Sequence, residues 1–169
     1  MKDSLLLNKD FWNNKYIASK TGWDVGKITT TVKEYFDQLN DKTLKLSLHG
    51  CGNSYETEYL FENKFINTYV VDYSEQALSN FSKRVPSFSK SKLLSNDFFN
   101  VQGKFDLIIE QTFFCAIDKS KRSDYFVKMN DLLKPNGKLV GLLFDDSLNE
   151  NHPPFGGSKS EYKEYFEAY

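Results

Sequence analysis

A short apolar segment that leads directly into a pair of glycines restricts the fold of this chain more than any other feature. Residues 44–49 (LKLSLH) are followed by GCG at 50–52, and then by Asn53 and Glu56 at the spacing of a capping box. A capping box marks the first turn of a helix, which we expect to extend to Phe65. The segment therefore predicts a strand, a glycine turn and a helix in succession.

The same alternation of strand and helix continues through the rest of the sequence. Helical spacing of apolar residues predicts a helix between Ser74 and Pro86 and another over 123–133, which a turn at 134–137 (KPNG) ends. Parallel strands need such crossovers, so the sequence predicts an α/β fold: a Rossmann-like, doubly wound and mostly parallel sheet with helices on both faces. Further segments rich in β-branched, aromatic or aliphatic residues predict its other strands, at 68–73, 92–95, 105–111 and 138–144.

The remaining segments lie at the two ends of the chain. The length of 169 residues fits a single domain, in which residues 1–42 form an N-terminal helical lid and residues 43–169 the Rossmann-like core. Ser158 and Glu161 have the spacing of a second capping box, and they predict a final helix. That helix carries its aromatic side chains on one side: Tyr162, Tyr165, Phe166 and Tyr169.

The charge balance argues against a nucleic acid or a membrane as the partner. There are 22 basic and 23 acidic residues, a net charge of −1 and only two arginines, whereas phosphate-binding surfaces are basic and use arginine forks. Cys51 and Cys115 lack the spacing of a disulfide framework or a metal site. With no signal sequence or membrane-spanning segment, the sequence predicts a cytoplasmic protein without a bound metal.

The glycine turn has the position at which doubly wound sheets bind their ligands. Ligands lie beyond the carboxyl ends of the strands, where the strand order reverses, and Gly50 and Gly52 would let a ligand approach the backbone there. Asp72 ends the second strand 20 residues after Gly52, where its carboxylate can accept hydrogen bonds from two ribose hydroxyls. Together these residues favour an adenosine site; a plain strand-to-helix turn without a ligand is the alternative.

The spacing of the glycines distinguishes among adenosine cofactors. In the G-x-G-x-x-G pattern of dinucleotide-binding proteins, the third glycine would fall on Tyr55, whose side chain would push the helix away from the sheet. The sequence also lacks the G-x-x-x-x-G-K-[ST] pattern of a phosphate-binding loop. An adenosine cofactor without phosphate fits best, and S-adenosylmethionine is the common one.

An ordered set of motifs over nearly the whole chain resembles the thiopurine S-methyltransferase family, which includes thiol and halide methyltransferases. The resemblance implies the class I S-adenosylmethionine-dependent methyltransferase fold and activity. In sequence order the motifs are FWNNKY at 11–16, KTGWD at 20–24, GCG at 50–52, VDYS at 71–74, NDFF at 96–99, FDLI at 105–108 and PPF at 153–155.

The resemblance also implies roles for individual residues. Trp12, Tyr16 and Trp23 look like the lid over the methionine half of the cofactor, where aromatic faces attract the sulfonium and exclude water. Packing in the core is the alternative for the two tryptophans. Gly50 resembles a backbone contact to the methionine amino group, and Asp72 resembles the ribose ligand.

The two ends of the cofactor have further candidates. Asp97 and Phe98 resemble an adenine clamp, in which the carboxylate accepts from the exocyclic amine and the ring packs on the base; a solvated turn is the alternative for Asp97. Gln111 matches a polar position near the methionine moiety. Many relatives have Glu-Arg-Thr here, whereas this chain has Glu110, Gln111 and Thr112. A charged contact to the cofactor's carboxylate is therefore expected to be absent.

The last strands of the family are a second point of departure. Relatives continue for about two more antiparallel strands, whereas this chain ends at Tyr169. We therefore expect a shortened or divergent member of lower stability, in which the strand at 138–144 is an exposed apolar edge and the final helix lacks a surface for its aromatic side. The protein is expected to be a monomer, or a dimer through that edge.

The sequence predicts an S-adenosylmethionine-dependent methyltransferase that moves a methyl group to a small soft nucleophile, a thiol, a thiopurine or a halide, by in-line displacement. Such a reaction needs alignment more than acid-base catalysis, and no catalytic residue is identified. Trp23 and Phe155 are the candidates for the acceptor wall. His49 is expected to be structural, and His152 could steer or deprotonate an acceptor. The first alternative is a non-catalytic S-adenosylmethionine-binding domain. The second, which the sequence favours less, is a nicotinamide-dependent oxidoreductase.

Overall fold

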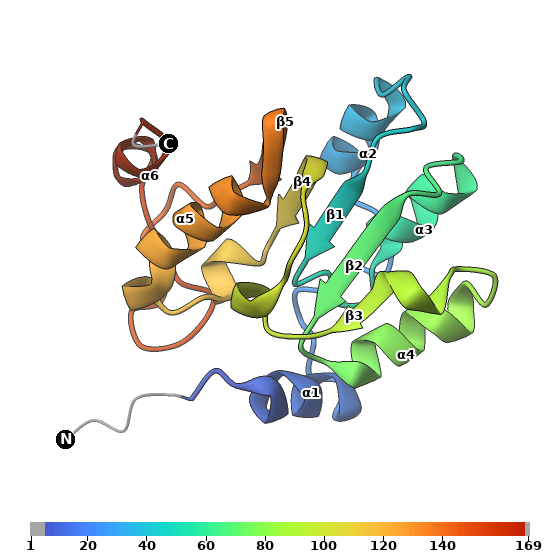
Figure 1. The fold of residues 1–169 in the computed structure, drawn as a ribbon. Coiled ribbons are helices and arrows are strands. Elements are labelled where there is room, and N and C mark those ends of the chain that lie inside the picture. Colours follow the sequence, from blue (N-terminus) through green and yellow to red (C-terminus); the bar gives the residue numbers. More distant parts are fainter. Residues whose placement is uncertain (1–5, 168–169) are drawn as a thin grey trace.

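One five-stranded sheet forms the centre of the computed structural model, which describes residues 6–167 (Figure 1). The strands follow the order β3-β2-β1-β4-β5, and every neighbouring pair is parallel. The predicted strands and their parallel arrangement are confirmed. Their bounds are β1 (Leu46–His49), β2 (Thr68–Asp72), β3 (Leu93–Ser95), β4 (Phe105–Gln111) and β5 (Leu133–Leu142).

Helices cover both faces of this sheet. The first face carries α2 (Thr30–Asp37), α3 (Tyr55–Glu62) and α4 (Glu75–Arg84), and the second carries α5 (Arg122–Leu132) and α6 (Lys159–Glu167) (Figure 1). The remaining helix, α1 (Lys9–Ile17), lies beyond the ends of the strands (Figure 1). This arrangement confirms the predicted Rossmann-like, doubly wound α/β fold.

Alternation along the strands produces two apolar layers. Successive side chains of a strand point to opposite faces, so Ile109 packs with Phe36 of α2 and Leu60 of α3, whereas its neighbour Ile108 packs with Phe126 of α5. Helix α2 is therefore part of the packed layers. Of the N-terminal segment, α1 and the loop that follows it are the parts that lie next to the strand ends.

The order of the strands reverses between β1 and β4. The chain passes outward from β1 through β2 to β3 and then crosses back to β4, so the connections that follow β1 and β4 leave in opposite directions. Such a reversal opens a crevice at the carboxyl ends of the strands. Gly50 and Thr112 directly follow the two strands, and they therefore lie at this crevice.

The predicted capping box at the start of α3 is wrong. The helix begins at Tyr55, and Ser54 precedes it in a left-handed conformation (φ 57°) without a side-chain cap. A left-handed residue directly before the helix displaces Asn53 from the cap position, and the Asn53 amide donates to Asp24 instead. The predicted cap at Ser74 is confirmed, because its hydroxyl oxygen accepts from a backbone N–H of the first turn of α4 at 3.1 Å.

The predicted turn at 134–137 lies within β5 rather than before it. The strand begins at Leu133, opposite Phe105, and the pairing register then shifts. The strand absorbs the turn residues as a bulge. Within the described residues β5 is an edge of the sheet, and Leu142 leaves 44% of its surface exposed there, as expected for an apolar edge.

The aromatic side of α6 packs against α5. Tyr165 stacks on Phe126 with the ring centroids 4.8 Å apart, and Tyr162 meets Phe114 edge to face at 5.4 Å. The expectation that this helix lacks a packing surface is therefore wrong, because α5 and the turn before it supply one. Tyr169 lies outside the described residues, and the shortened C-terminal part of the fold stays a prediction.

Residues 6–167 contain neither a membrane-spanning helix nor a metal cluster. None of the helices there is long and apolar enough to cross a bilayer. The same residues contain no group of three or more histidine, cysteine, aspartate or glutamate side chains placed to hold a metal ion. Both cysteines, Cys51 and Cys115, are free thiols.

Candidate functional site

The turn that follows β1 depends on two glycines in left-handed conformations. Gly50 has a φ of 56° and Gly52 a φ of 54°, values that other residues rarely adopt. A Cβ atom on Gly50 would overlap the ring of Phe113, and one on Gly52 would overlap the hydroxyl of Tyr16. Neither position can carry a side chain without moving an aromatic neighbour, so the backbone itself forms the surface of the turn.

Asp72 joins the end of β2 to the glycine turn. One carboxylate oxygen accepts from the Gly52 N–H at 2.8 Å, and the other accepts from the Ser74 N–H at 2.7 Å. The side chain is 7% exposed. Burial raises its pKa, whereas the two N–H groups lower it. Since a carboxylate has about four lone-pair positions, about two stay available to further donors.

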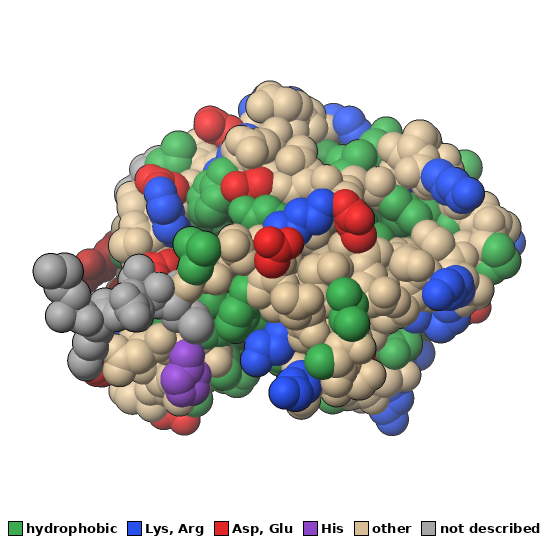
Figure 2. Space-filling view, turned by 90° about the horizontal axis from the view of Figure 1, so that it is seen from below, with side chains coloured by type: hydrophobic (Ala, Val, Ile, Leu, Met, Phe, Trp, Pro, Cys, Tyr) green, Lys and Arg blue, Asp and Glu red, His purple; other side chains and the backbone are tan. Residues whose placement is uncertain are grey.

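A large cavity of about 600 Å³ opens beside the turn at the carboxyl ends of the strands, a volume typical of cofactor and substrate sites. Figure 2 views the molecule from this side and shows hydrophobic side chains with basic, acidic and histidine side chains among them. The wall comes from α1 and the loop after it, from the ends of β2 and β3, and from the segments that follow β4 and β5. It includes these predicted cofactor residues: Trp12, Tyr16, Trp23, Gly50, Asp72, Asp97 and Phe98.

A small cavity of about 70 Å³ lies on the other side of the same turn. The two remaining cofactor candidates, Gly52 and Gln111, line it. The side-chain oxygen of Gln111 accepts from the Thr29 hydroxyl at 2.8 Å. The two cavities meet at the glycine turn, because both are bordered by the same residues: Tyr16, Trp23, Gly50 and Thr112. The nine predicted residues are thus brought together around one corner, on two sides of it.

The aromatic side chains of the N-terminal segment lie over this corner. Trp23 meets Trp12 edge to face at 5.8 Å and Tyr16 at 6.1 Å, and its indole N–H donates to the Tyr16 hydroxyl at 3.4 Å. Trp23 is 41% exposed, so it is not packed in the core. Burial raises the pKa of the Tyr16 phenol far above its ordinary value, which keeps this side chain neutral.

Asp97 and Phe98, which follow β3, both line the large cavity. The Asp97 carboxylate accepts from the Phe99 N–H at 2.9 Å and begins a short helical turn. The Phe98 ring is 4% exposed and meets His49 edge to face at 5.1 Å. Burial lowers the pKa of His49 to about 3, so its imidazole is neutral and packs as an aromatic side chain. This environment agrees with the structural role expected for His49.

Phe155 does not lie where the sequence predicts it. Its ring is 4% exposed and lines neither cavity, and its N–H donates to the Cys115 carbonyl at 2.7 Å. Pro153 and Pro154 line the large cavity instead. The backbone bond to Cys115 turns Phe155 inward, and the two residues before it consequently face the cavity.

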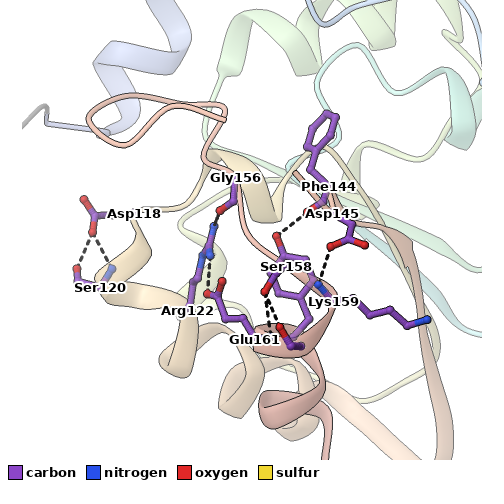
Figure 3. A network of polar contacts seen from close by, with 11 residues as sticks. Asp118, Ser120, Arg122, Phe144, Asp145, Gly156, Ser158, Lys159 and Glu161 are labelled. Atoms are coloured by element: carbon purple, nitrogen blue, oxygen red, sulfur yellow. Dashed lines mark hydrogen bonds and ion pairs between the residues drawn. The ribbon is translucent and has the colours of Figure 1, made fainter. Parts of the chain in front are cut away.

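The loop that carries these prolines is anchored by Arg122, which the sequence did not single out. Its guanidinium donates to the Gly156 carbonyl at 2.6 Å and to the Glu161 carboxylate at 2.6 Å (Figure 3). It also lies 4.8 Å from the centre of the Phe114 ring, and the residue is 1% exposed. One of only two arginines, at the start of a helix, is the sequence signal that could have indicated this role.

Glu110 holds the turn after β4, and it too was missed. One carboxylate oxygen accepts from the Phe113 N–H at 2.9 Å and from the Phe114 N–H at 2.7 Å. The side chain is 1% exposed, and burial raises its pKa to about 7. These bonds fix the Phe113 ring over Gly50. An acidic residue near the end of the apolar segment FDLIIEQ is the signal that could have found it.

Comparison with known protein families identifies the chain. The model of a family described as "Thiopurine S-methyltransferase (TPMT)" matches residues 7–169. The chain belongs to the thiopurine S-methyltransferase family. This membership confirms the predicted family and, with it, a methyltransferase that uses S-adenosylmethionine. The alternative of a nicotinamide-dependent oxidoreductase is therefore wrong, as the bulky Tyr55 in place of a third glycine suggests.

Two plant members of the family illustrate the level of similarity. A probable thiol methyltransferase 2 of Arabidopsis thaliana is 31% identical over 159 residues, which cover 90% of this chain and 69% of the relative. A thiocyanate methyltransferase 1 of Brassica oleracea is 28% identical over 159 residues, which cover 90% and 70% respectively. The matched segment thus includes most of this chain and about two thirds of each plant enzyme.

Solved structures show the same fold at low sequence identity. A crystal structure of the 1,6-didemethyltoxoflavin-N1-methyltransferase of Burkholderia thailandensis, with bound 1,6-didemethyltoxoflavin and S-adenosylhomocysteine, matches with a TM-score of 0.76 at 14% identity. The match covers 95% of this chain and 74% of that enzyme. It supports the Rossmann-like methyltransferase fold of this member of the family.

Proposed function

We propose that the protein transfers a methyl group from S-adenosylmethionine to a small soft nucleophile, a thiol, a thiopurine or a halide ion, within the large cavity. When bound, S-adenosylmethionine supplies a methyl group on a positively charged sulfur. The observation that carries the proposal is the meeting of two cavities at Gly50 beneath Tyr16 and Trp23. A backbone corner that excludes side chains suits a bulky ligand, and aromatic faces above it suit a cation.

The end of the large cavity near β2 and β3 has the chemistry for adenosine. The free lone pairs of Asp72 can accept from ribose hydroxyls. Asp97 offers a carboxylate oxygen beside the Phe98 ring, and both residues line the cavity. A planar apolar surface next to a hydrogen-bond acceptor matches a purine with an exocyclic amine. We therefore assign these three residues to the adenosine half of the cofactor.

The opposite end of the large cavity suits a small acceptor. Phe144, Pro153 and Pro154 line the cavity there, and we assign the acceptor wall to the two prolines in place of Phe155. Apolar surfaces favour weakly hydrated nucleophiles over strongly hydrated ones, because desolvation costs the former less. The names of the plant relatives, which refer to a thiol and to thiocyanate, agree with this class of acceptor.

Charged side chains of both signs line the large cavity. Lys15 and Lys121 lie in its wall together with Asp72, Asp97 and Asp118, so the apolar surface, rather than a net positive charge, carries the preference for a soft acceptor. An acceptor that arrives as an anion needs no base. The Nδ1 atom of His152 lies 3.0 Å from the Pro153 carbonyl oxygen, so Nε2 is the ring nitrogen that this contact leaves available to a neutral thiol.

A methylation assay tests the proposed function. Purified protein is incubated with S-adenosylmethionine labelled in the methyl group and, separately, with iodide, thiocyanate, hydrosulfide and a thiopurine. We expect methylated product from at least one of them, and none with the Asp72→Ala variant. Calorimetric titration with S-adenosylhomocysteine accompanies the assay. Binding without turnover of any acceptor would support the non-catalytic alternative, and absence of binding would overturn the assignment of the cofactor site.

A further inference from the structure

Three charged side chains, Asp24, Lys27 and Glu56, line the small cavity. We propose that it holds the amino-acid end of the cofactor, with Lys27 as the cationic partner of the carboxylate and Glu56 as the anionic partner of the ammonium group. This inference rests on the proposed function, since it extends the same cofactor across the glycine corner. It also revises the expectation that a charged contact to the carboxylate is absent because residue 111 is glutamine.

The position of the cavity fits an amino-acid end. A ligand whose sulfur lies beside Gly50 has its adenosine on the side of Asp72, and its other substituent must extend past the glycine turn in the opposite direction. The small cavity begins there, because Gly50, Tyr16 and Trp23 border both cavities. Its volume of about 70 Å³ is room for several water molecules, and hence for a compact polar group.

Lys27 is the cation of this cavity. The other charged side chains that line it are Asp24 and Glu56. Among the described residues Lys27 makes no ion pair, so its ammonium group is available to a ligand. Gln111 lies in the same wall and uses its side-chain oxygen for the Thr29 hydroxyl, which leaves its amide N–H groups as additional donors toward a carboxylate.

Glu56 is the anion best placed for an ammonium group. It is half-buried in the first turn of α3, and burial raises its pKa, while the backbone N–H groups of Glu56 and Thr29 lower it. Among the described residues it forms no ion pair. Asp24 is already engaged, because its two oxygens accept from the Gly26 N–H and the Asn53 amide. We therefore expect a ligand cation in this cavity to pair with Glu56 rather than with Asp24.

The test compares two ligands that differ in the amino-acid end. S-Adenosylhomocysteine carries both the ammonium and the carboxylate, whereas 5′-methylthioadenosine has the same adenosine and sulfur but a single methyl group in place of the whole amino-acid chain. Calorimetric titration gives the affinity of each ligand for the wild type, Lys27→Met and Glu56→Gln. The matched controls are Lys20→Met in the same loop and Glu62→Gln on the same helix, since neither residue lines a cavity.

We expect Lys27→Met to lower the affinity for S-adenosylhomocysteine by about fivefold and Glu56→Gln to lower it by about tenfold. Both values lie in the range of charge-assisted pairs at partly exposed sites. The affinity for 5′-methylthioadenosine and both controls should stay within about twofold of the wild type. Equal losses for both ligands would show that the two residues only shape the fold, and unchanged S-adenosylhomocysteine affinity would likewise overturn the inference. A wild type that binds neither ligand would instead refute the proposed function.

Discussion

The two cavities on either side of Gly50 are built by different means. The small cavity is enclosed by a glycine turn, short loops and the charged side chains of Asp24, Lys27 and Glu56. The large cavity is walled mainly by aromatic and aliphatic side chains from several elements. Polar surroundings with fixed charges suit a ligand part of defined charge and shape, whereas an apolar wall accepts a range of soft groups.

The difference explains how members of one family can share a cofactor and differ in acceptor. The residues that form the small cavity come from the first strand and its turn, from the start of α3, from the end of β4 and from the N-terminal loop. The glycines and Asp72 fix the turn among them. The acceptor end of the large cavity comes from loops that follow β4 and β5, which are held by Glu110 and Arg122. Loops on a rigid scaffold can vary without disturbing the fold.

The strongest test of the corner that the cavities share is Asp72→Ala. The substitution removes the acceptor of two buried N–H groups, so we expect the free energy of unfolding to fall by about 3 kcal/mol. The affinity for S-adenosylhomocysteine should fall by about 100-fold, since the ribose loses its partner as well. Denaturant unfolding and calorimetry measure the two effects. Asp118→Ala, which removes a carboxylate from the acceptor end of the large cavity, should leave cofactor affinity unchanged.

Glu110→Gln tests the wall between the cavities through pH. Burial raises the pKa of Glu110 in the folded protein to about 7, above its ordinary value of 4.5, so the neutral acid favours the folded state. Its contribution to stability is complete below pH 4.5 and is lost as the pH rises through 7. We expect the wild type to lose about 1 kcal/mol relative to the variant for each pH unit between these values. Urea unfolding at several pH values measures this difference.

His49 provides the check on that comparison. Its pKa is lowered to about 3, so its stabilising contribution is present above pH 6.5 and is lost as the pH falls toward 3. This effect is common to the wild type and Glu110→Gln and cancels in the difference between them. A difference that does not change between pH 4.5 and 7 would show that Glu110 is charged in the folded protein.

Gly50→Ala sharpens the comparison by adding one methyl group at the junction. The left-handed conformation (φ 56°) should cost about 1–2 kcal/mol of stability, and displacement of the Phe113 ring should lower S-adenosylhomocysteine affinity by about 30-fold, or ~2 kcal/mol. Gly22→Ala is the control, because no atom lies within 4 Å of a Cβ at that position. Equal affinities for both variants would contradict the role of the corner.

Trp23→Leu separates charge recognition from simple covering and has the smallest expected effect. Because Trp23 is 41% exposed, stability should change by no more than about 0.5 kcal/mol. The affinity for the cationic S-adenosylmethionine should fall by about tenfold and that for the uncharged thioether of S-adenosylhomocysteine by about twofold, since a cation–π contact is lost only with the former. Equal losses would indicate that the indole merely excludes water.

Much of the fold and of the cofactor corner could be predicted from the sequence. The GCG turn could be predicted because glycines in a short segment between a strand and a helix indicate a tight turn by themselves. The parallel sheet could be predicted from the regular alternation of strands and helices. The capping box at Asn53 failed because a left-handed Ser54 displaces it. Similarly, the side of the loop that faces the cavity depends on a bond between Phe155 and Cys115, which are far apart in the sequence.

The anchoring residues could not be assigned from the sequence for the same reason. Arg122 acts on Gly156 and Glu161, which only the packing of α6 on α5 brings within reach. Glu110 acts on its own turn, but its role depends on burial by the second face of the sheet. Lys27 and Glu56 belong to different elements, and their common cavity exists only once the N-terminal loop lies over the glycine turn.

A crystal structure of the protein with S-adenosylhomocysteine would test the central claim most directly. We expect electron density that passes over Gly50, with the adenosine in the large cavity on Asp72 and the amino-acid end in the small cavity between Lys27 and Glu56. A ligand bound wholly within the large cavity, or away from the glycine turn, would contradict the claim that the two cavities form one site.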